Sequence, residues 1–189
     1  MKYEAVVLGV SAGGLTALTR ILSVLPVNYT LPVIVVQHRS RDERFLLEEV
    51  LQAKCKIRIR QAEEKEPVKA GSVYIAPPDY HLLIEQNGTF SLSYDALVKY
   101  SRPSIDVLFE TAAEVYTDKL LAIILTGANN DGSRGMEAIS RRGGTTIAQQ
   151  PATAEYPDMP AAAIKTGCIQ KIMDLDSIKK YLLDLMKNA

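Results

Sequence analysis

The stretch Ala5-Val6-Val7-Leu8-Gly9-Val10-Ser11-Ala12-Gly13-Gly14 determines the fold that we expect for this chain. Residues 5–10 are mostly apolar and partly β-branched, and they end at a glycine-rich turn, which is typical of a buried strand. After the turn, leucines recur at helical spacing before Pro26, at Leu15, Leu18, Leu22 and Leu25. A buried strand followed at once by an amphipathic helix predicts the start of a βαβ unit.

The alternation of buried strands and amphipathic helices continues along the chain. We expect further strands at residues 33–36, 57–60, 72–76, 120–125, 145–149 and 168–173. We expect helices around residues 45–51, 104–115, 136–142 and 160–164, and a terminal helix after residue 176. Ser104 and Asp176 are the expected N-caps of two of these helices. Asn87-Gly88 lies between short strand patterns at residues 81–85 and 89–93, which predicts an antiparallel hairpin.

These patterns together predict one α/β domain over residues 1–189. We expect a three-layer, doubly wound fold whose sheet is mostly parallel, with the antiparallel hairpin at one edge. The chain has 189 residues, of which 47% are hydrophobic and 23% charged, and this suits a single globular domain with a sizeable core.

The composition argues against several classes of function. The 22 basic and 22 acidic residues balance, so the chain lacks the broad positive field on which non-specific nucleic-acid binding depends. Apolar runs stay short of a membrane span and the N-terminus has no signal-peptide pattern, so we expect a cytoplasmic protein without membrane insertion. Two histidines and the widely spaced Cys55 and Cys168 do not form a zinc motif, and we expect no metal or organic cofactor.

Three chemically useful side chains follow three of the predicted parallel strands. Ser11 follows the first strand, His38 follows the second, and Asp131 lies in the loop after residues 120–125. The carboxyl ends of parallel strands meet at one edge of a sheet, which is where such folds place their sites. A serine hydroxyl needs an imidazole to take its proton and a carboxylate to orient that imidazole. The sequence therefore predicts a catalytic triad of Ser11, His38 and Asp131.

Each member of this triad also has a purely structural interpretation. Ser11 could cap a helix, His38 could be a structural histidine at a strand end, and Asp131 could form an Asx-turn or cap a helix. The second histidine, His81, is expected to lie away from the edge where Ser11 and Asp131 converge. The joint placement of all three residues at strand ends favours catalysis.

The glycine-rich turn is compatible with other families of site, which can be compared with the sequence directly. A Rossmann fingerprint needs a glycine at Ser11 and an acidic residue at the end of the second strand, where Gln37-His38 stands. A Walker A loop needs Gly-Lys-Ser/Thr, which the turn lacks. An α/β-hydrolase has its triad in the order serine, acid, histidine, whereas the order here is serine, histidine, aspartate.

Six motifs in order resemble the CheB-type chemotaxis protein-glutamate methylesterases across nearly the whole chain. The similar stretches are Gly9-Val10-Ser11-Ala12-Gly13-Gly14, Val36-Gln37-His38, Val73-Tyr74-Ile75-Ala76-Pro77-Pro78-Asp79-Tyr80-His81, Arg102-Pro103-Ser104-Ile105-Asp106, Leu125-Thr126-Gly127-Ala128-Asn129-Asn130-Asp131-Gly132 and Met159-Pro160-Ala161-Ala162-Ala163-Ile164.

The resemblance implies a signal-transduction hydrolase that removes methyl groups from glutamyl methyl esters on the cytoplasmic helices of chemoreceptors. Methanol is the expected product, and deamidation of receptor glutamines is an expected second activity. The partner implied is thus a methylated chemoreceptor, a methyl-accepting chemotaxis protein. The resemblance further implies an oxyanion hole formed by backbone amides, for which Ala12 and Ala128 are the candidates, and substrate contacts from Arg102 and Met159.

Some positions depart from the family pattern. The family's N-terminal receiver domain, with its phosphorylated aspartate, has no counterpart in these residues, and Tyr100-Ser101 stands where members often have Arg-His. Two further functions remain open: an esterase or amidase for a small molecule, which would need a closed pocket, and a docking module that has kept the fold without the activity.

Overall fold

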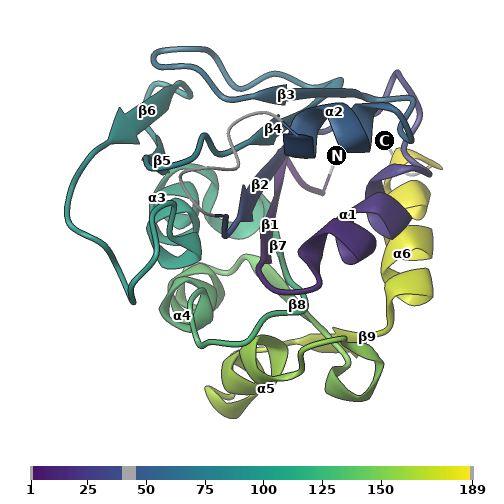
Figure 1. The fold of residues 1–189 in the computed structure, drawn as a ribbon, viewed down its shortest axis with the longest axis vertical. Coiled ribbons are helices and arrows are strands. Elements are labelled where there is room, and N and C mark those ends of the chain that lie inside the picture. The colour runs from purple at the N-terminus through teal and green to yellow at the C-terminus, as the bar shows by residue number, and fades with distance from the viewer. Residues whose placement is uncertain (1, 40–45, 188–189) are drawn as a thin grey trace.

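A seven-stranded sheet forms the middle layer of the computed structural model, which describes residues 2–39 and 46–187 (Figure 1). Every pairing within this sheet is parallel, and the spatial order of the strands is β3-β4-β2-β1-β7-β8-β9. The strands are β1 (Ala5–Val10), β2 (Val33–Gln37), β3 (Arg58–Gln61), β4 (Ser72–Ile75), β7 (Leu120–Ile124), β8 (Thr145–Gln149) and β9 (Lys171–Met173).

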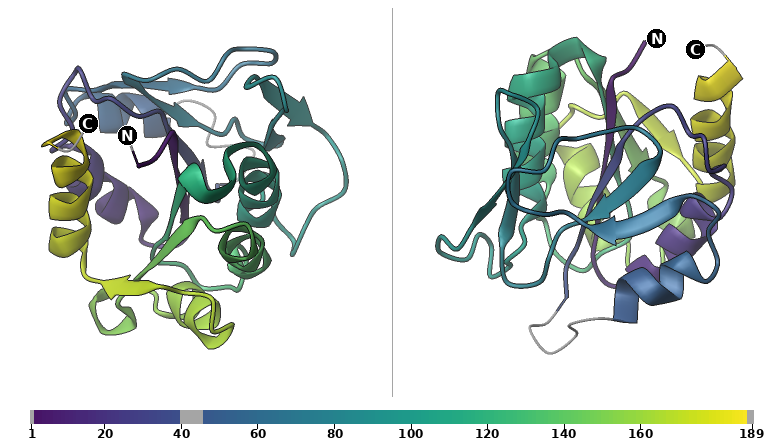
Figure 2. Two further views of the ribbon diagram at one scale, coloured as in Figure 1. Left: turned by 180° about the vertical axis from the view of Figure 1, so that it is seen from behind. Right: turned by 90° about the horizontal axis from the view of Figure 1, so that it is seen from above.

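Helices cover both faces of the sheet (Figure 2). One face carries α1 (Gly14–Leu22), α2 (Leu46–Gln52) and α6 (Leu175–Lys187). The other face carries α3 (Ile105–Tyr116), α4 (Ser133–Arg141) and α5 (Asp158–Lys165), and two short 3₁₀ turns lie at Thr117–Lys119 and Pro151–Thr153. The three-layer α/β fold is therefore confirmed.

Strand β1 shows why the sequence contains uninterrupted apolar runs. Its side chains alternate between the two cores: Val6, Leu8 and Val10 face the layer of α1, whereas Ala5 and Val7 face the layer of α3. Because both faces of a central parallel strand are covered by helices, every position must be apolar.

The predicted antiparallel hairpin is also confirmed, and it forms a sheet of its own. Strands β5 (His81–Ile84) and β6 (Phe90–Ser93) pair with each other, while β3 lies at the edge of the parallel sheet next to β4. The chain leaves β4 through Pro77-Pro78, and since proline has no backbone N–H it cannot extend the ladder. The hairpin packs instead against α3, where the N–H of Ile84 donates to Thr111 Oγ1 (3.2 Å).

The C-terminal part differs from the prediction at two points. Strand β9 is shorter than the predicted segment 168–173 and begins only at Lys171. The terminal helix begins at Leu175, so the prediction of Asp176 as N-cap is wrong. The carboxylate that accepts from a first-turn N–H is that of Asp174, 2.7 Å from the N–H of Ser177. Asp176 pairs instead with the cations of Arg20 and Lys179.

Two other expectations concern the region of α2 and the membrane. Phe45, which we expected on the inner face of the second helix, lies outside the described residues. No helix in the part of the chain that the structure describes is long and apolar enough to cross a membrane.

The contact between α3 and α4 depends on a glycine. A Cβ added to Gly135 would collide with the Cβ of Phe109, so α4 approaches α3 as closely as the backbone allows. This contact holds the start of α4, which follows Asp131, against α3.

We expect Gly135→Ala to destabilise the fold by about 1–3 kcal/mol, because the added methyl must push two packed helices apart. Urea unfolding monitored by circular dichroism measures this change. Ser140→Ala, on the same helix, is the control and should change the free energy of unfolding by less than about 0.5 kcal/mol. Equal stability of the two variants would contradict the close contact.

Candidate active site

The sheet brings the ends of β1, β2 and β7 together, because β1 lies between the other two strands. Ser11 is the first residue after β1, and its N–H donates to the carbonyl of Thr126 (3.0 Å) just beyond β7. The N–H of His38, after β2, donates to the carbonyl of Val10 (3.0 Å). These backbone bonds fix the starting points of two of the predicted site side chains at the carboxyl edge of the sheet.

Ser11, His38 and Asp131 form a continuous chain of contacts. His38 Nδ1 lies 3.2 Å from Ser11 Oγ, and His38 Nε2 lies 2.8 Å from Asp131 Oδ2. The His38 side chain is 10% exposed and that of Asp131 is fully buried. A carboxylate can only accept, so Nε2 carries the hydrogen and Nδ1 is left as an acceptor that faces the serine hydroxyl.

Hydrogen-bond donors surround this acceptor nitrogen. Asn129 Nδ2 lies 3.2 Å from His38 Nδ1, and Ser101 Oγ lies 3.5 Å away from it. Both residues come from loops at the same edge as Asp131, so they are donors close to the single acceptor position of Nδ1 that Ser11 Oγ also faces. Sequence reasoning did not single out Asn129 or Ser101 as partners of the histidine.

The Asp131 carboxylate also caps a helix that is distant in sequence. It accepts from the N–H groups of Ile105 (2.7 Å) and Asp106 (3.1 Å) in the first turn of α3. It accepts further from its neighbour Gly132 (3.0 Å) and from Ser104 Oγ (3.0 Å). Ser104 does occupy the N-cap position, but its hydroxyl donates to Asp131 and makes no capping bond of its own. The Asp131 carboxylate caps α3 and also accepts from His38, so the structural interpretation of Asp131 does not exclude the catalytic one.

The environment of Asp131 keeps it ionised. Burial by itself raises the pKa of this carboxyl. The hydrogen bond and charge of His38, together with the N–H groups of Ile105 and Asp106, outweigh burial and lower the pKa below the ordinary value of 3.8. The positive end of the α3 dipole acts in the same direction.

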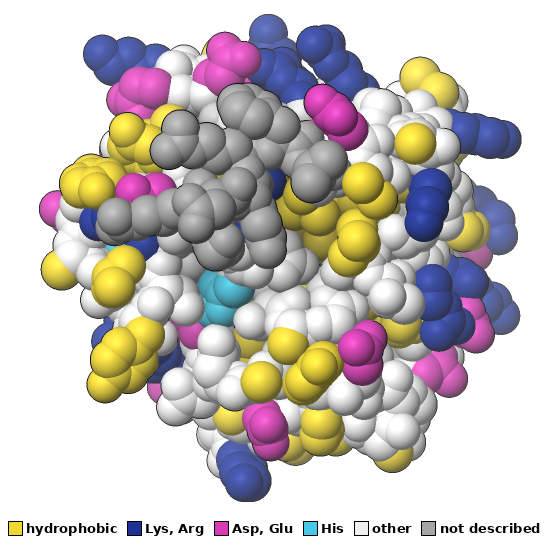
Figure 3. Space-filling view, in the orientation of Figure 1, with side chains coloured by type: hydrophobic (Ala, Val, Ile, Leu, Met, Phe, Trp, Pro, Cys, Tyr) yellow, Lys and Arg dark blue, Asp and Glu magenta, His cyan; other side chains and the backbone are white. Residues whose placement is uncertain are grey.

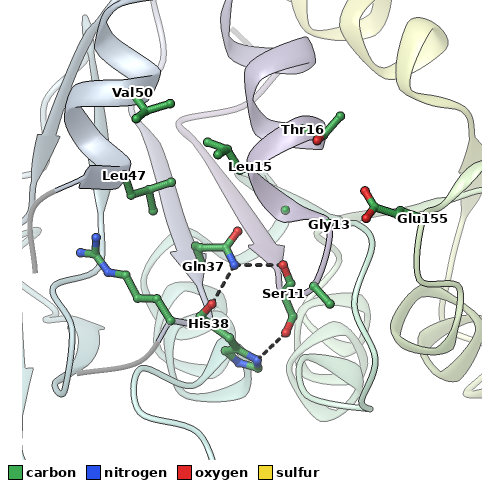
Figure 4. Close-up of a pocket in the computed structure, with 12 residues that line it drawn as sticks. Ser11, Gly13, Leu15, Thr16, Gln37, His38, Leu47, Val50 and Glu155 are labelled. Carbon is green, nitrogen blue, oxygen red and sulfur yellow. Dashed lines mark hydrogen bonds between the residues drawn. The ribbon is translucent and has the colours of Figure 1, made fainter. Parts of the chain in front are cut away.

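Gln37 connects the nucleophile to the histidine. Its Nε2 donates to the carbonyl oxygens of Ser11 (2.9 Å) and His38 (2.7 Å), as Figure 4 shows. Its Oε1 packs over Gly14 so closely that a Cβ there would collide with it. Gln37 therefore fixes the two backbone segments that carry Ser11 and His38. The one signal in the sequence is a polar residue at the end of a buried strand.

A cavity of about 500 Å³ opens beside Ser11. Leu15, Leu47 and Val50 form an apolar wall, and Glu155 lies on the other side, near the start of α1 (Figure 4). Figure 3 shows hydrophobic side chains gathered around a hollow near the middle of this face, with histidine atoms at the surface nearby. Arg39 also lines the cavity, but its guanidinium is paired with Glu48 (2.8 Å). The cavity therefore offers apolar contact next to the reacting hydroxyl.

The two alanines predicted for the oxyanion hole lie in the loops that follow the neighbouring strands β1 and β7. Ala12 lines the cavity, and Ala128 is exposed at the start of the loop that carries Asp131. Within residues 2–39 and 46–187, no acceptor bonds the backbone N–H of either alanine. Met159 is fully buried beneath the same loop, where its side chain packs on Gly127 and its N–H donates to the Gly127 carbonyl (2.9 Å).

Arg102 is anchored within the protein. Its side chain is 6% exposed, its guanidinium pairs with Asp79 (2.8 Å), and it donates to the carbonyls of Tyr94 (3.0 Å) and Asp95 (2.7 Å). It also lies over the Tyr94 ring, 3.7 Å from the centroid. Arg102 thus fixes the long segment between β6 and α3 at both of its ends.

His81 lies nearer to the site than the sequence suggested. Its Nδ1 accepts from the N–H of Ser104 (3.2 Å), at the start of α3, and its Nε2 faces the carbonyl of Ala96 (3.1 Å). Both ring nitrogens are therefore engaged by backbone, and His81 supports the segment before α3. Across the described ranges, no group of three or more histidine, cysteine, aspartate or glutamate side chains is arranged to hold a metal ion.

We expect Asp131→Asn to destabilise the protein by about 1–3 kcal/mol at pH 7. The NH2 group of the new amide must face N–H or O–H donors that the carboxylate accepted from, and two donors cannot bond each other. This difference should narrow as the pH falls below 3.8, since a carboxylate with a lowered pKa stabilises the fold above that pH and loses the effect as it is protonated. Urea unfolding of both proteins between pH 7 and pH 2 measures the difference. A difference in the free energy of unfolding that stays constant over this pH range would contradict the stabilising role of the Asp131 charge.

We expect Gln37→Met to slow the reaction of Ser11 with a fluorophosphonate by about tenfold, because the serine and histidine segments lose their common tether. Gln52→Met is the matched control. The amide of Gln52 also bridges two carbonyls, those of Cys55 and Ile57, and Gln52 is not among the described residues that line the cavity beside Ser11. It should lower stability and leave the labelling rate unchanged. Equal rates in the two variants would show that Gln37 acts on stability alone.

Comparison with known proteins places the chain in a family. Residues 6–182 match the family model described as CheB methylesterase. A protein of Leptospira interrogans is 49% identical over 191 residues, which cover 100% of this chain and 97% of that protein. The protein-glutamate methylesterase/protein-glutamine glutaminase 2 of Caulobacter vibrioides is 35% identical, and the match covers 95% of this chain and 53% of that protein.

A solved structure agrees with this assignment. The crystal structure of the Thermotoga maritima CheB methylesterase catalytic domain superposes with a TM-score of 0.93 at 35% sequence identity. The superposition covers 98% of this chain and 100% of that chain. On the family match and on these relatives, the chain belongs to the CheB methylesterase family.

Proposed function

We propose that this chain is a protein-glutamate methylesterase that removes methyl groups from glutamyl esters of a methylated chemoreceptor. The observation that carries the proposal is the chain of contacts from Ser11 through His38 to Asp131, in a member of the CheB methylesterase family. We further propose that residues 1–189 act as one catalytic domain in the cytoplasm, with no cofactor, nucleic acid or membrane insertion.

The first half of the reaction forms an acyl-enzyme. Ser11 Oγ attacks the ester carbonyl and passes its proton to His38 Nδ1, 3.2 Å away. The tetrahedral intermediate then breaks its bond to the methoxy oxygen, which takes the proton from Nδ1 and leaves as methanol. Asp131 accepts the Nε2 hydrogen throughout and stabilises the imidazolium that forms.

The second half releases the receptor glutamate. A water molecule attacks the acyl carbon while His38 Nδ1 takes its proton, and the proton then returns to Ser11 Oγ as the acyl bond breaks. A glutamine side chain enters the same sequence with ammonia as the first leaving group. Deamidation therefore needs no additional residue.

The backbone N–H groups of Ala12 and Ala128 are the proposed donors that stabilise the oxyanion of both intermediates. Ala12 follows the nucleophile directly and lies just before α1, near the helix end whose dipole favours negative charge. The exposed position of Ala128 leaves its N–H available to a bound substrate. Donors aimed at a developing oxyanion are commonly worth about 10²- to 10³-fold in rate each.

The surroundings of Ser11 favour a protein substrate over an enclosed small molecule. Among the described residues, part of the hydrophobic wall beside Ser11 is accessible from outside, since Leu15 is 44% exposed. Met159 takes part by supporting the loop of Ala128 from below. Arg102 takes part by fixing the segment between β6 and α3.

We expect the wild-type chain to release methanol from methylated receptor membranes and Ser11→Ala to release none, because the variant has no nucleophile. Radiolabelled methyl groups make the release measurable. Ser140→Ala, a serine on α4, is the control and should match the wild type.

A second readout separates the competing functions. If the wild type released no methanol while a fluorophosphonate still labelled Ser11, the chain would be a hydrolase with another substrate. If neither occurred, the docking-module hypothesis would replace the enzyme.

A further inference from the structure

A strained turn stands at the edge of the site, in the segment between β6 and α3. The N–H of Val98 donates to the carbonyl of Ser101 (3.1 Å), and the N–H of Ser101 donates back to Val98 (2.9 Å). The two residues between them, Lys99 and Tyr100, both have positive φ, 48° and 63°. Two-residue turns with two positive φ angles strongly prefer Asn-Gly, because bulky side chains are strained there.

Lys99 holds this turn against the catalytic loop. Its ammonium group pairs with Asp106 Oδ2 (2.8 Å) and donates to the carbonyl of Asn130 (2.9 Å), next to Asp131. The Asp106 carboxylate is fully buried and its other oxygen accepts from the N–H of Gly135 (2.8 Å). The turn is thereby joined to α3, α4 and the aspartate loop, so its strained conformation is maintained.

The turn brings one side chain toward the site and presents the other to solvent. Ser101 Oγ lies 3.5 Å from His38 Nδ1. Tyr100, its neighbour, is 97% exposed, and the segment that carries it swings out from the body of the protein (Figure 1). A tyrosine that is almost fully exposed adds nothing to the packing of the fold. Strain that persists without a gain in packing is a common property of functional sites.

We infer that Tyr100 is a specificity-determining residue that contacts the receptor helix beside the methylated glutamate. The inference rests on the proposed function, because Ser11 must reach an ester carried by that helix. Tyrosine suits such a contact, since it offers a large, rigid ring at a low cost in conformational entropy. No residue of the segment between β6 and α3 lines the cavity beside Ser11. Contact with Tyr100 therefore requires a substrate that extends beyond the cavity, as the proposed receptor helix would.

The test compares Tyr100→Gly with the wild type on methylated receptor membranes and on a fluorophosphonate. We expect KM for the receptor to rise by about 5- to 30-fold, which is the usual range for the loss of an aromatic anchor. The kcat value and the rate of Ser11 labelling should not change. Glycine adopts a positive φ without strain, so the melting temperature should be at least that of the wild type. A loss of receptor binding then cannot be attributed to unfolding.

Two further variants complete the experiment. Tyr100→Phe keeps the ring and should keep KM within about twofold of the wild type. Ile172→Ala removes an exposed apolar side chain on β9, at the other end of the sheet, and should leave all values unchanged.

An unchanged KM in Tyr100→Gly would overturn the inference, as would a parallel loss of Ser11 labelling, which would mean that the turn positions His38. These outcomes differ from failure of the proposed function, in which the wild type itself releases no methanol. The inference would then fall with the function on which it rests.

Discussion

The buried carboxylate of Asp131 joins the fold of this protein to its chemistry. The same two oxygens cap the first turn of α3 and accept the Nε2 hydrogen of His38. A buried charge is tolerated only when it is paired and hydrogen-bonded, and the α3 backbone provides most of that compensation. The catalytic acceptor is thus ionised because the helix begins beside it, and the helix begins there because the acceptor caps it. Neither element can be moved without the other.

The order of the strands explains which imidazole nitrogen meets which partner. His38 directly follows β2, Ser11 directly follows the adjacent β1, and Asp131 follows β7, one strand further away. Neighbouring strands are about 4.8 Å apart. Nδ1 lies closer to the histidine backbone than Nε2, so it meets the serine of the adjacent strand. Nε2, at the far side of the ring, reaches the aspartate beyond it. Gln37 holds the backbone segment from which the imidazole spans this distance.

The parallel strands could be predicted from the sequence because burial on both faces requires uninterrupted apolar runs. The convergence of Ser11, His38 and Asp131 could be predicted because the carboxyl ends of parallel strands lie at one edge of the sheet. Contacts between segments far apart in the chain leave no periodic pattern. The capping of α3 by Asp131, the bridging by Gln37 and the backbone partners of His81 are all of this kind. Asp174 and Asp176 differ little in local sequence, so only the docked position of α6 shows which one caps it.

The residues of the site fall into two groups with different physical constraints. Asp131, His38 and Gln37 are tied to the sheet and to α3, so a change in any of them alters stability and chemistry together. The turn of Lys99 and Tyr100 is fixed by an ion pair with the buried Asp106, and its outer side chain has no packing role. A residue at this position can therefore change without disturbing the core. Within a fold that couples catalysis so closely to stability, such a turn is a position where substrate preference can vary independently of the reaction.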